Sequence, residues 1–590
     1  MWAREFKLRI SQAAAGSSDR RFHRFIVASM IATLVVVATP LAANAQANRK
    51  GLKFCGHLGT TVQASSGAQM YCFGPQQNGA AAAKTLTSAQ TTSTSASTST
   101  LKLGSNVDAA TVSEDVTPSG VQAHGQSEVS VAAAGPYVVE AWNDSTGFFA
   151  PCGSLQNKEE LTGLAFSNNG GASFVDLGGV PNANCAFSLA EGDPSVEAYQ
   201  AGGNTYFYIS SIFIPFNVPE NALSLTACKV SGSGATATLA CSQPIVAAIS
   251  SDCTTFDGFT FCSFLDKEFL AIDAARGKLY MSYTEFGVTT GPNGIVEVAA
   301  CDLSNPANPT CHNGSDGSIF GAGAPAPPYF VVAPGDPNFC ENEGSYPAVD
   351  RSTGDLYVAY EHNWFTAVFG GPPCNTEPTQ EVMNFIRAAC LTSSSTSPCA
   401  TPDATQVVDI TSLQAVQIPG YNRFPMNDFP RVAVSDAAGA ASMVWNDARQ
   451  HGTGDIFLQS FNTGSLTAVQ SSPVRVNSKS DTGGWHFLPA LRQADVNGNL
   501  NVSFYSRPAN SFLTNVFAAL KVNPRITATP TKNDVQITTG ASNWSADSSL
   551  IVPNFGDYTD NYLLGSTLFV SWSDGRLGFP QPFEGHTSVH

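Results

Sequence analysis

Charged residues are scarce in this sequence. Asp, Glu, Lys and Arg make up 13% of the 590 residues, whereas hydrophobic residues make up 43%. Acidic residues outnumber basic ones by 46 to 29, and no Arg occurs between Lys50 and Arg276. A chain with so little positive charge lacks the electrostatic footprint of a nucleic-acid-binding protein, and an anionic membrane surface does not attract it. We therefore expect no nucleic-acid partner.

Several catalytic and cofactor motifs are also missing. The sequence contains no G-x-S-x-G, no P-loop, no H-E-x-x-H and no C-x-x-C pair. These absences argue against the hydrolase, nucleotide and zinc sites that such motifs build. We predict no cofactor. A structural Ca²⁺ in the Asp/Asn-rich turn 495–499 is the exception we consider, although such turns usually hold no ion.

Amphipathic helices are missing as well. No stretch after residue 50 has apolar residues at the 3.6-residue period of a helix. The chain has 51 Gly and 35 Pro, which suit strands and turns. We therefore predict an all-β fold.

One β-rich pattern occurs seven times. In residues 266–286 it reads DKEFLAIDAARGKLYMSYTEF: a polar head, an apolar run, a turn and a second β-rich run. The second runs end 60 to 85 residues apart, at Trp142, Ile209, Tyr283, Tyr360, Trp445, Tyr505 and Trp572. This period is too long for a hairpin but suits a four-stranded sheet, and sheets repeated around an axis form a β-propeller. We predict seven blades, with six as the alternative.

Too few residues follow the last copy to complete its sheet. Only 14 residues remain after Arg576, enough for one strand. We therefore expect residues about 105–123 to close the ring by pairing with the last sheet.

The N-terminal region reads as an export signal and a linker. Arg20, Arg21 and Arg24 precede an apolar run over residues 25–39, and the A-x-A site at 43–45 predicts cleavage before Gln46. A retained anchor is the alternative, but 15 residues are short for a span. We divide the chain into a signal peptide (1–45), a disordered extension with one Cys pair and a Ser/Thr-rich linker (46–104), and the propeller (105–590). The propeller is expected to be secreted or periplasmic.

All 14 Cys follow the signal, and an even number in an exported chain indicates disulfides. Spacing does not determine connectivity, and the simplest connectivity is sequential. It gives Cys55–Cys72, Cys152–Cys185, Cys228–Cys241, Cys253–Cys262, Cys301–Cys311, Cys340–Cys374 and Cys390–Cys399.

A turn motif follows the first copy. Residues 167–174, SNNGGASF, resemble the Asp-box S-x-D-x-G-x-x-W of sialidase-type propellers, with Asn169 and Phe174 at the Asp and Trp positions. In such a turn a short polar side chain bonds backbone N–H groups and Gly supplies positive φ. We assign this outer turn no catalysis.

With the heads DKEFLAID, YPAVD, FPRVAV and FGDY, residues 120–580 look like the secreted bacterial sialidase-like, or BNR-repeat, propellers. The resemblance implies a propeller that acts on glycan. Sialidases use an arginine triad, a Tyr–Glu pair and an Asp acid, but the F/Y-R-I-P motif of their first Arg is absent here.

The polar heads and the ends of the second strands should open on one face of a propeller, around one mouth. Residues that occur once are the better candidates for chemistry, and the catalytic set is Asp557, Tyr558, Arg431 and His486. The ligand-binding set is Asp266, Lys267, Asp428, Trp485, Arg449, Arg507 and Arg576. The near copies at 445–449 and 572–576, W-x-D-x-R, favour a structural ion pair between blades.

The candidate residues around this mouth are consistent with two functions. The first is binding of extracellular glycan or protein by a monomer, without turnover. The second is glycan cleavage by a sialidase-type glycoside hydrolase or a polysaccharide lyase. Cleavage requires two carboxyl groups, or a Tyr/carboxylate pair, within about 5–10 Å, and at least one perturbed pKa.

Overall fold

The computed structural model separates the chain into two compact units, Met1–Leu52 and Lys53–His590. It describes residues 102–103, 106–114, 125–149, 160–183, 185, 188–215, 218–256, 258–287, 294–311, 330–335, 340–364, 378–391, 404–423, 426–478, 483–530, 534–546 and 553–589. All of these belong to the second unit. The predicted signal, the linker and Cys55–Cys72 lie outside the described residues.

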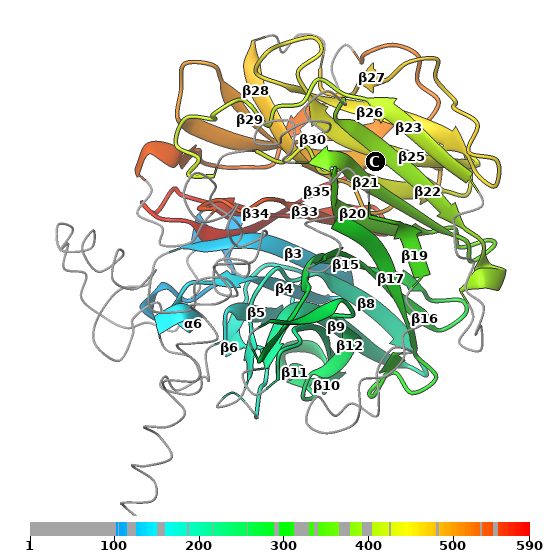
Figure 1. Ribbon diagram of the computed structural model, residues 1–590. Coiled ribbons are helices and arrows are strands. Elements are labelled where there is room, and N and C mark those ends of the chain that lie inside the picture. The colour runs from blue at the N-terminus through cyan, green and yellow to red at the C-terminus, as the bar shows by residue number, and fades with distance from the viewer. Residues whose placement is uncertain are drawn as a thin grey trace, which may run out of the picture. The chain divides into compact units, whose positions relative to one another are not determined.

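Seven antiparallel sheets follow one another around an axis, which confirms the seven-bladed β-propeller (Figure 1). Blade 1 contains β3 (Gln126–Ala134), β4 (Tyr137–Asp144), β5 (Thr162–Ser167) and β6 (Val175–Gly179). Blade 2 contains β7 (Ser188–Ala190), β8 (Val196–Ala201), β9 (Asn204–Pro215), β10 (Ala222–Ser231), β11 (Thr238–Cys241) and β12 (Ile245–Ile249). A separate hairpin follows, β13 (Cys253–Phe256) and β14 (Phe259–Cys262). Blade 3 contains β15 (Phe264–Asp273), β16 (Lys278–Phe286), β17 (Gly294–Asp302), β18 (Thr310–Cys311) and β19 (Phe330–Ala333).

The remaining blades repeat this order. Blade 4 contains β20 (Glu341–Val349), β21 (Leu356–Trp364), β22 (Gln380–Ile386) and β23 (Ala404–Asp409). Blade 5 contains β24 (Arg431–Ser435), β25 (Ala440–Asp447), β26 (Asp455–Asn462) and β27 (Val474–Arg475). Blade 6 contains β28 (Gly484–Ala490), β29 (Leu500–Pro508), β30 (Leu513–Val522), β31 (Asp534–Gln536) and β32 (Ser542–Asn543). Blade 7 contains β33 (Asp560–Leu564), β34 (Thr567–Asp574), β35 (Gln581–Ser588), β2 (Asn106–Asp108) and β1 (Lys102–Leu103). The short helices are α6 (Thr146–Phe149), η2 (Val112–Glu114), η3 (Gly234–Thr236), η5 (Ala388–Cys390) and η6 (Trp544–Ala546).

The N-terminal strand closes the ring, as the sequence predicts. In blade 7, β2 pairs with β35, with Val107 opposite Glu584. Asn106 also reaches blade 6, because its Nδ2 donates to the carbonyl of Ile537 (3.1 Å) and its Oδ1 accepts from the backbone N–H of Thr539 (2.6 Å). On the other side of blade 7, β3 lies beside β33 and β34 (Figure 1).

The innermost strands are interrupted near their first residues. In β3, β15, β20 and β28 the pairing register with the second strand shifts by a bulge. Glu128 (φ 53°) and Lys267 (φ 55°) lie within the interruptions of β3 and β15 and have left-handed backbone. Asp193 (φ 54°), between β7 and β8, has the same backbone conformation. A β-bulge changes the direction in which the side chains beside it point. We call the end of the axis where the innermost strands begin the mouth, and the opposite end the turn end.

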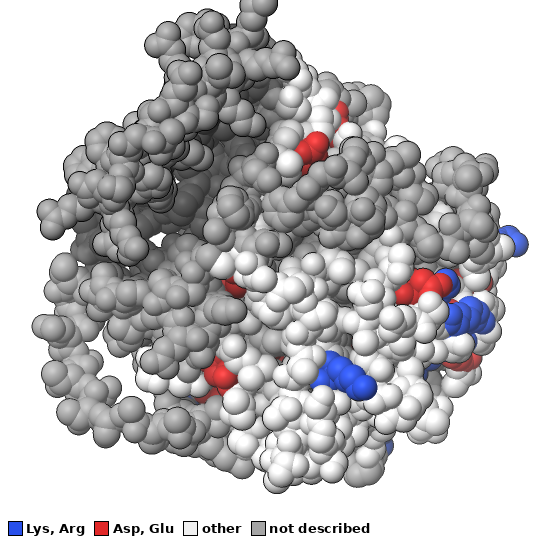
Figure 2. Space-filling view, turned by 90° about the horizontal axis from the view of Figure 1, so that it is seen from below, with Lys and Arg blue, Asp and Glu red and all other residues white. Residues whose placement is uncertain are grey.

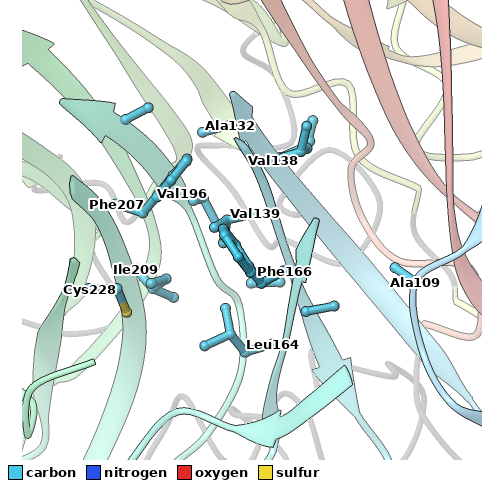
Figure 3. Packing of buried hydrophobic residues seen from close by; sticks show 14 of the residues in the cluster. Ala109, Ala132, Val138, Val139, Leu164, Phe166, Val196, Phe207, Ile209 and Cys228 are labelled. Atoms are coloured by element: carbon cyan, nitrogen blue, oxygen red, sulfur yellow. The ribbon is translucent and has the colours of Figure 1, made fainter. Parts of the chain in front are cut away.

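Apolar side chains fill the spaces between blades. Val139, Leu164 and Phe166 of blade 1 pack against Phe207 and Ile209 of blade 2 (Figure 3). The same cluster includes Val107 and Ala109 of the closing strand segment. The closing strand therefore belongs to the core.

The turn between β5 and β6 has the hydrogen bonds expected of its motif. Asn169 Oδ1 accepts from the backbone N–H of Ser173 (3.0 Å), and Ser167 Oγ accepts from that of Gly171 (3.0 Å). Gly171 has φ 83°, and Phe174 is buried. The turn stabilises an outer hairpin and contributes nothing to the axis.

On the face that Figure 2 shows, the charged side chains of the described residues are few, and at the right of the view acidic and basic side chains lie side by side. No helix among these residues is long and apolar enough to span a bilayer.

Three of the predicted disulfides are present, Cys228–Cys241, Cys253–Cys262 and Cys301–Cys311. Cys185, Cys340 and Cys390 are disulfide-bonded as well, and their predicted partners Cys152, Cys374 and Cys399 lie outside the described residues. Disulfides of this kind are typical of proteins from oxidising compartments.

Replacing Cys301 and Cys311 together by Ala should lower the free energy of unfolding. The disulfide joins β17 to β18 across 10 residues, and a cross-link of that length restricts the unfolded chain by about 2–3 kcal/mol. Urea unfolding of the oxidised proteins measures the difference. With a reducing agent present, the wild type should lose stability and the double variant should lose less; an equal loss would contradict the assignment.

Candidate functional site

Five charged side chains meet on the axis near the mouth. Lys267 Nζ lies 2.9 Å from Glu128 Oε1, 2.6 Å from Asp193 Oδ2 and 3.0 Å from Asp557 Oδ2. Arg423 Nη1 contacts the same oxygen of Asp557. All five are buried, with no more than 3% of any residue exposed. We call these five residues the axial ion cluster.

The cluster is assembled from separate blades. Glu128 lies in β3, Lys267 in β15, and Asp193 and Asp557 precede β8 and β33. Left-handed backbone at Glu128, Asp193 and Lys267 is unusual for residues with a side chain, and it is strained. Strain of this kind persists only where the surroundings impose it, and it concentrates at functional sites.

Neighbouring polar groups complete the cluster. Asn143 of β4 donates through Nδ2 to Glu128 Oε2 and to Asp193 Oδ1, the latter at 3.0 Å. The hydroxyl of Tyr421 lies 2.9 Å from the carbonyl of Gly556 and 3.2 Å from Asp557 Oδ1, and these two acceptors share its proton. The resulting hydrogen-bond network fixes every carboxylate of the cluster.

Burial and proximity move the pKa values of these groups in different directions. Burial and then Asp193 raise the pKa of Glu128, against the effect of Lys267. Burial opposes ionisation of Asp193, but Lys267 and the hydrogen bonds from Glu128, Lys267 and Asn143 together lower the pKa of this carboxyl. Burial raises the pKa of Asp266 to about 7. The cluster thus holds carboxyl groups of different proton affinity within one site.

An aromatic layer lies below the ions. The guanidinium of Arg431 stacks on Phe269 (4.5 Å), Tyr346 (4.8 Å) and Tyr558 (5.6 Å). Arg431 Nη1 also donates to the carbonyl of Pro430 (3.2 Å). Lys267 Nζ lies 5.5 Å above the Tyr558 ring, so this layer supports the cluster.

A third layer borders a cavity at the turn end. Arg492 Nη2 pairs with Asp560 Oδ2 (2.9 Å), and Arg492 Nε donates to Tyr346 Oη (3.1 Å). The cavity measures about 420 Å³, and Arg492 and Glu197 are among its lining residues. Because every layer is filled, the axis is plugged between the mouth and this cavity.

The structure brings together Asp266, Lys267, Asp557, Tyr558 and Arg431 of the predicted site residues. They form a buried core of ions and aromatic rings, where the sequence suggested an open lip. The other predicted residues lie apart from it.

The W-x-D-x-R residues are structural, although the ion pair lies within each motif and not between blades. Asp447 Oδ2 accepts from Trp445 Nε1 (3.1 Å) and Arg449 Nη2 (2.5 Å). Asp574 holds Trp572 and Arg576 in the same way, both at 2.6 Å. Only Arg449 also reaches a neighbouring blade, through the carbonyl of Asp409. In blades 5 and 7 the Asp of the motif thus ties together the Trp before it and the Arg after it at the end of the second strand.

The remaining predicted residues pack between blades. Arg507 lies over Trp485 (5.9 Å) and Trp544 (5.4 Å) and donates to the carbonyl of Pro419. His486 is buried, and its Nδ1 lies 3.6 Å from Asp455 Oδ1. Asp428 accepts from Asn446 and the backbone of Leu413, and burial raises its pKa to about 8.

Sequence reasoning missed Arg423, Tyr421 and Asn143. The first two lie in residues 419–425, PGYNRFP. Arg423 is the one charged residue of this segment, among Pro and aromatic residues, and that isolation could have marked it as a candidate site residue. Asn143 lies near the end of β4, one residue after Trp142.

Two candidate metal sites carry no ion-binding geometry. Glu220, Cys253 and Cys262 form the one three-residue group of close ligand atoms in the described ranges, but the two cysteines form a disulfide. In the turn 495–499, Asp495 Oδ1 accepts from the backbone N–H groups of Asn497 and Asn499, as in an ordinary Asx turn.

Comparison with known proteins gives similar folds only. No family model and no curated protein matches the chain. Among solved structures, it is similar to Trypanosoma rangeli sialidase (TM-score 0.33, 11% identity, 80% of this chain and 58% of that chain). It is also similar to the Hadza microbial sialidase Hz136 (0.37, 11%, 73% and 74%) and to the NanB sialidase of Streptococcus pneumoniae (0.32, 9%, 79% and 69%). This chain thus spans less than two thirds of the Trypanosoma protein, and similarity at these TM-scores says nothing of its activity.

Proposed function

We propose that this protein is an exported, sialidase-like propeller that binds extracellular glycan at the mouth of its axis without cleaving it. The observation that carries the proposal is the axial ion cluster. Replacing buried ions by apolar groups of similar size is often neutral or stabilising, so stability alone gives little reason to keep them. Three of these ions also have strained backbone, which supports a functional role.

The chemistry around the cluster suits a sugar. Carboxylates and amides can bond hydroxyl groups, and aromatic rings offer apolar faces for a pyranose ring. Asn143 and Tyr421 supply polar groups beside the ions, and the Trp364 ring lies 5.8 Å from the guanidinium of Arg423.

Two features favour binding over turnover. Asp557 Oδ2 already pairs with both Lys267 and Arg423, so this oxygen is not free to act on a substrate. Arg431, Arg507 and Arg576 have separate sets of partners, so they do not form the arginine triad of a sialidase.

Cleavage is the second candidate, and one contact favours it. The hydrogen bond from Tyr421 to Asp557 forms a Tyr/carboxylate pair, with several further carboxyl groups bound to the same Lys267. A hydrolase or lyase would use Tyr421 once a ligand displaced part of the network.

A glycan array and a panel of fluorogenic glycosides and polysaccharides test both candidates. We expect the wild type to bind at least one glycan class and to turn over none. Asp557→Asn should weaken binding at least about tenfold, because it removes the charge that orders Lys267 and Arg423. Asp574→Asn is the matched control, a buried, ion-paired aspartate of the same blade, and should bind as the wild type does.

Three results would decide against glycan binding: no glycan bound, equal loss in both variants, or capture of a protein ligand alone. Turnover that Tyr421→Phe abolishes would establish the enzyme instead.

A further inference from the structure

The cavity at the turn end of the axis lies opposite the mouth and has the size of a small-molecule site. Its volume is about 420 Å³, within the range of pockets that hold small ligands. The innermost strands β8, β15, β20, β24 and β33 line it, together with residues that follow β28, so blades 2 to 7 all take part. We call it the turn-end cavity.

The wall of the turn-end cavity is apolar in part, and its rim is open to solvent. Leu270, Val434 and Leu563 are lining residues from three different blades. At the rim, in the turn after β28, Val496 is 90% exposed. Arg351 at the rim is exposed as well. A ligand can therefore enter from solvent, and its apolar part gains free energy by covering these side chains.

Arg492 lies at the inner end of the cavity, but its guanidinium is already engaged. Its Nε donates to Tyr346 Oη (3.1 Å), its Nη1 to the carbonyl of Val196 and its Nη2 to Asp560 Oδ2 (2.9 Å). Each nitrogen of the guanidinium thus has an acceptor within the protein. An anionic ligand would have to displace one of these acceptors, so this end of the cavity does not favour an anion.

Glu197 is the polar group of the wall with capacity to spare. It is buried, with 3% exposed. Its Oε2 accepts from the backbone N–H of Ala198 (3.3 Å) and its Oε1 from Arg492 Nη1 (3.4 Å), and both bonds are long. A carboxylate has about four acceptor sites. A buried carboxylate with long hydrogen bonds favours a ligand that brings N–H donors and positive charge.

The charges around the cavity point the same way. Three acidic side chains, Glu197, Asp436 and Asp495, line it against two basic ones, Arg351 and Arg492. The charge of Arg492 is already balanced by its pair with an aspartate outside the lining. Arg351 lies near Asp436 and offsets that carboxylate. The balance that a ligand meets is therefore negative.

We propose that the turn-end cavity binds a small organic cation, an ammonium or guanidinium group on an apolar chain, with its charged head on Glu197. The head donates to the carboxylate, and the chain covers the apolar wall towards Val496 at the rim. The axial ion cluster lies at the other end of the axis, behind filled layers. The inference therefore does not depend on the glycan proposal.

Three probes with one chain and different heads test the proposal on the full-length wild-type protein: hexylammonium, 1-hexanol and hexanoate. In titrations followed by ligand NMR at about pH 8, hexylammonium should bind at least about tenfold more tightly than 1-hexanol, and hexanoate should not bind. Equal affinity for hexylammonium and 1-hexanol, preference for hexanoate, or no saturable binding of hexylammonium at millimolar concentration would each overturn the proposal.

Two variants place the charged head. Glu197→Gln keeps the shape of the side chain and removes its charge, so the affinity for hexylammonium should fall at least about tenfold while that for 1-hexanol stays the same. Glu297→Gln is the control, a buried glutamate of β17 outside the lining of the cavity, and should change neither affinity. Full affinity of Glu197→Gln for hexylammonium, or an equal loss in both variants, contradicts the assignment.

The pH dependence of the wild type is a further test and needs no variant to fold. Burial raises the pKa of Glu197 to about 7, with Arg492 and Arg351 acting against it and Asp560 with it; Tyr562 is the other titratable group that interacts with it. Protonation removes the charge that holds the ammonium. The affinity for hexylammonium should therefore fall about tenfold from pH 8 to pH 6, and that for 1-hexanol should stay constant. A constant or rising affinity for hexylammonium would rule out Glu197 as its partner.

Discussion

Lys267→Met should be the most damaging single substitution in the axis. It removes the one ammonium that contacts Glu128, Asp193 and Asp557 and leaves these carboxylates buried. Removing one partner of a buried pair costs about 3–5 kcal/mol, because the remaining charge is uncompensated. Urea unfolding at neutral pH should show a loss of this size.

The loss should shrink in acid. Without the ammonium, burial should raise the folded-state pKa values of Glu128 and Asp193 above their unfolded values, because Lys267 no longer opposes it. A carboxyl group whose pKa is raised by folding is destabilising only while it is ionised in the folded state. Its cost to the free energy of unfolding is therefore absent below its unfolded pKa and grows as pH rises towards its folded pKa. Lowering the pH from 7 towards 5 should therefore narrow the gap between variant and wild type.

Lys278→Met provides the control for Lys267→Met. Lys278 pairs with Asp302 at 2.6 Å, but both side chains are partly exposed, 23% and 32%. Exposed pairs contribute about 0.2–1 kcal/mol. Equal losses of unfolding free energy in the two variants would contradict the contribution of about 3–5 kcal/mol that we assign to Lys267 in the axial ion cluster.

Deleting the closing strand should have the second large effect. A chain that begins at residue 115 lacks β1 and β2, and with them the buried Val107, Ala109 and Ala110. It also exposes the edge of β35, a template for aggregation. We expect a loss of roughly 5 kcal/mol or more from lost burial and hydrogen bonds, seen in urea unfolding and as aggregation in light scattering.

A chain that begins at residue 101 is the control for this deletion, since it keeps both strands. Asn106→Ala is a milder test within the full chain. It removes the hydrogen bonds to Ile537 and Thr539 and should cost about 2–3 kcal/mol. Equal stability of the two shortened chains would mean that blade 7 closes without its N-terminal strand.

The ring could be predicted because its signal is repeated and local. Each copy pairs an apolar run with a β-rich run across a turn, and seven copies fix seven sheets. The closing strand followed from counting, since the 14 residues after Arg576 cannot complete a blade. The three described disulfides were predictable because each joins adjacent strands of one hairpin.

The site was predictable only in part, because its residues are far apart in the sequence and the sequence does not show which of them contact one another. The polar heads correctly placed Lys267 and Asp557 near one end of the axis. Their burial was not foreseen, because alternation in a strand does not reveal that a bulge turns a residue inward at positive φ.

Closure by the N-terminal strand also sets the order of folding during synthesis. Arg576 in blade 7 donates to Asn106, 470 residues earlier in the chain. Bringing such distant segments together costs loop-closure entropy that no earlier contact repays. The segment with β1 and β2 therefore has no sheet partner until β35 has been synthesised, and blade 7 is the last of the seven sheets to be completed.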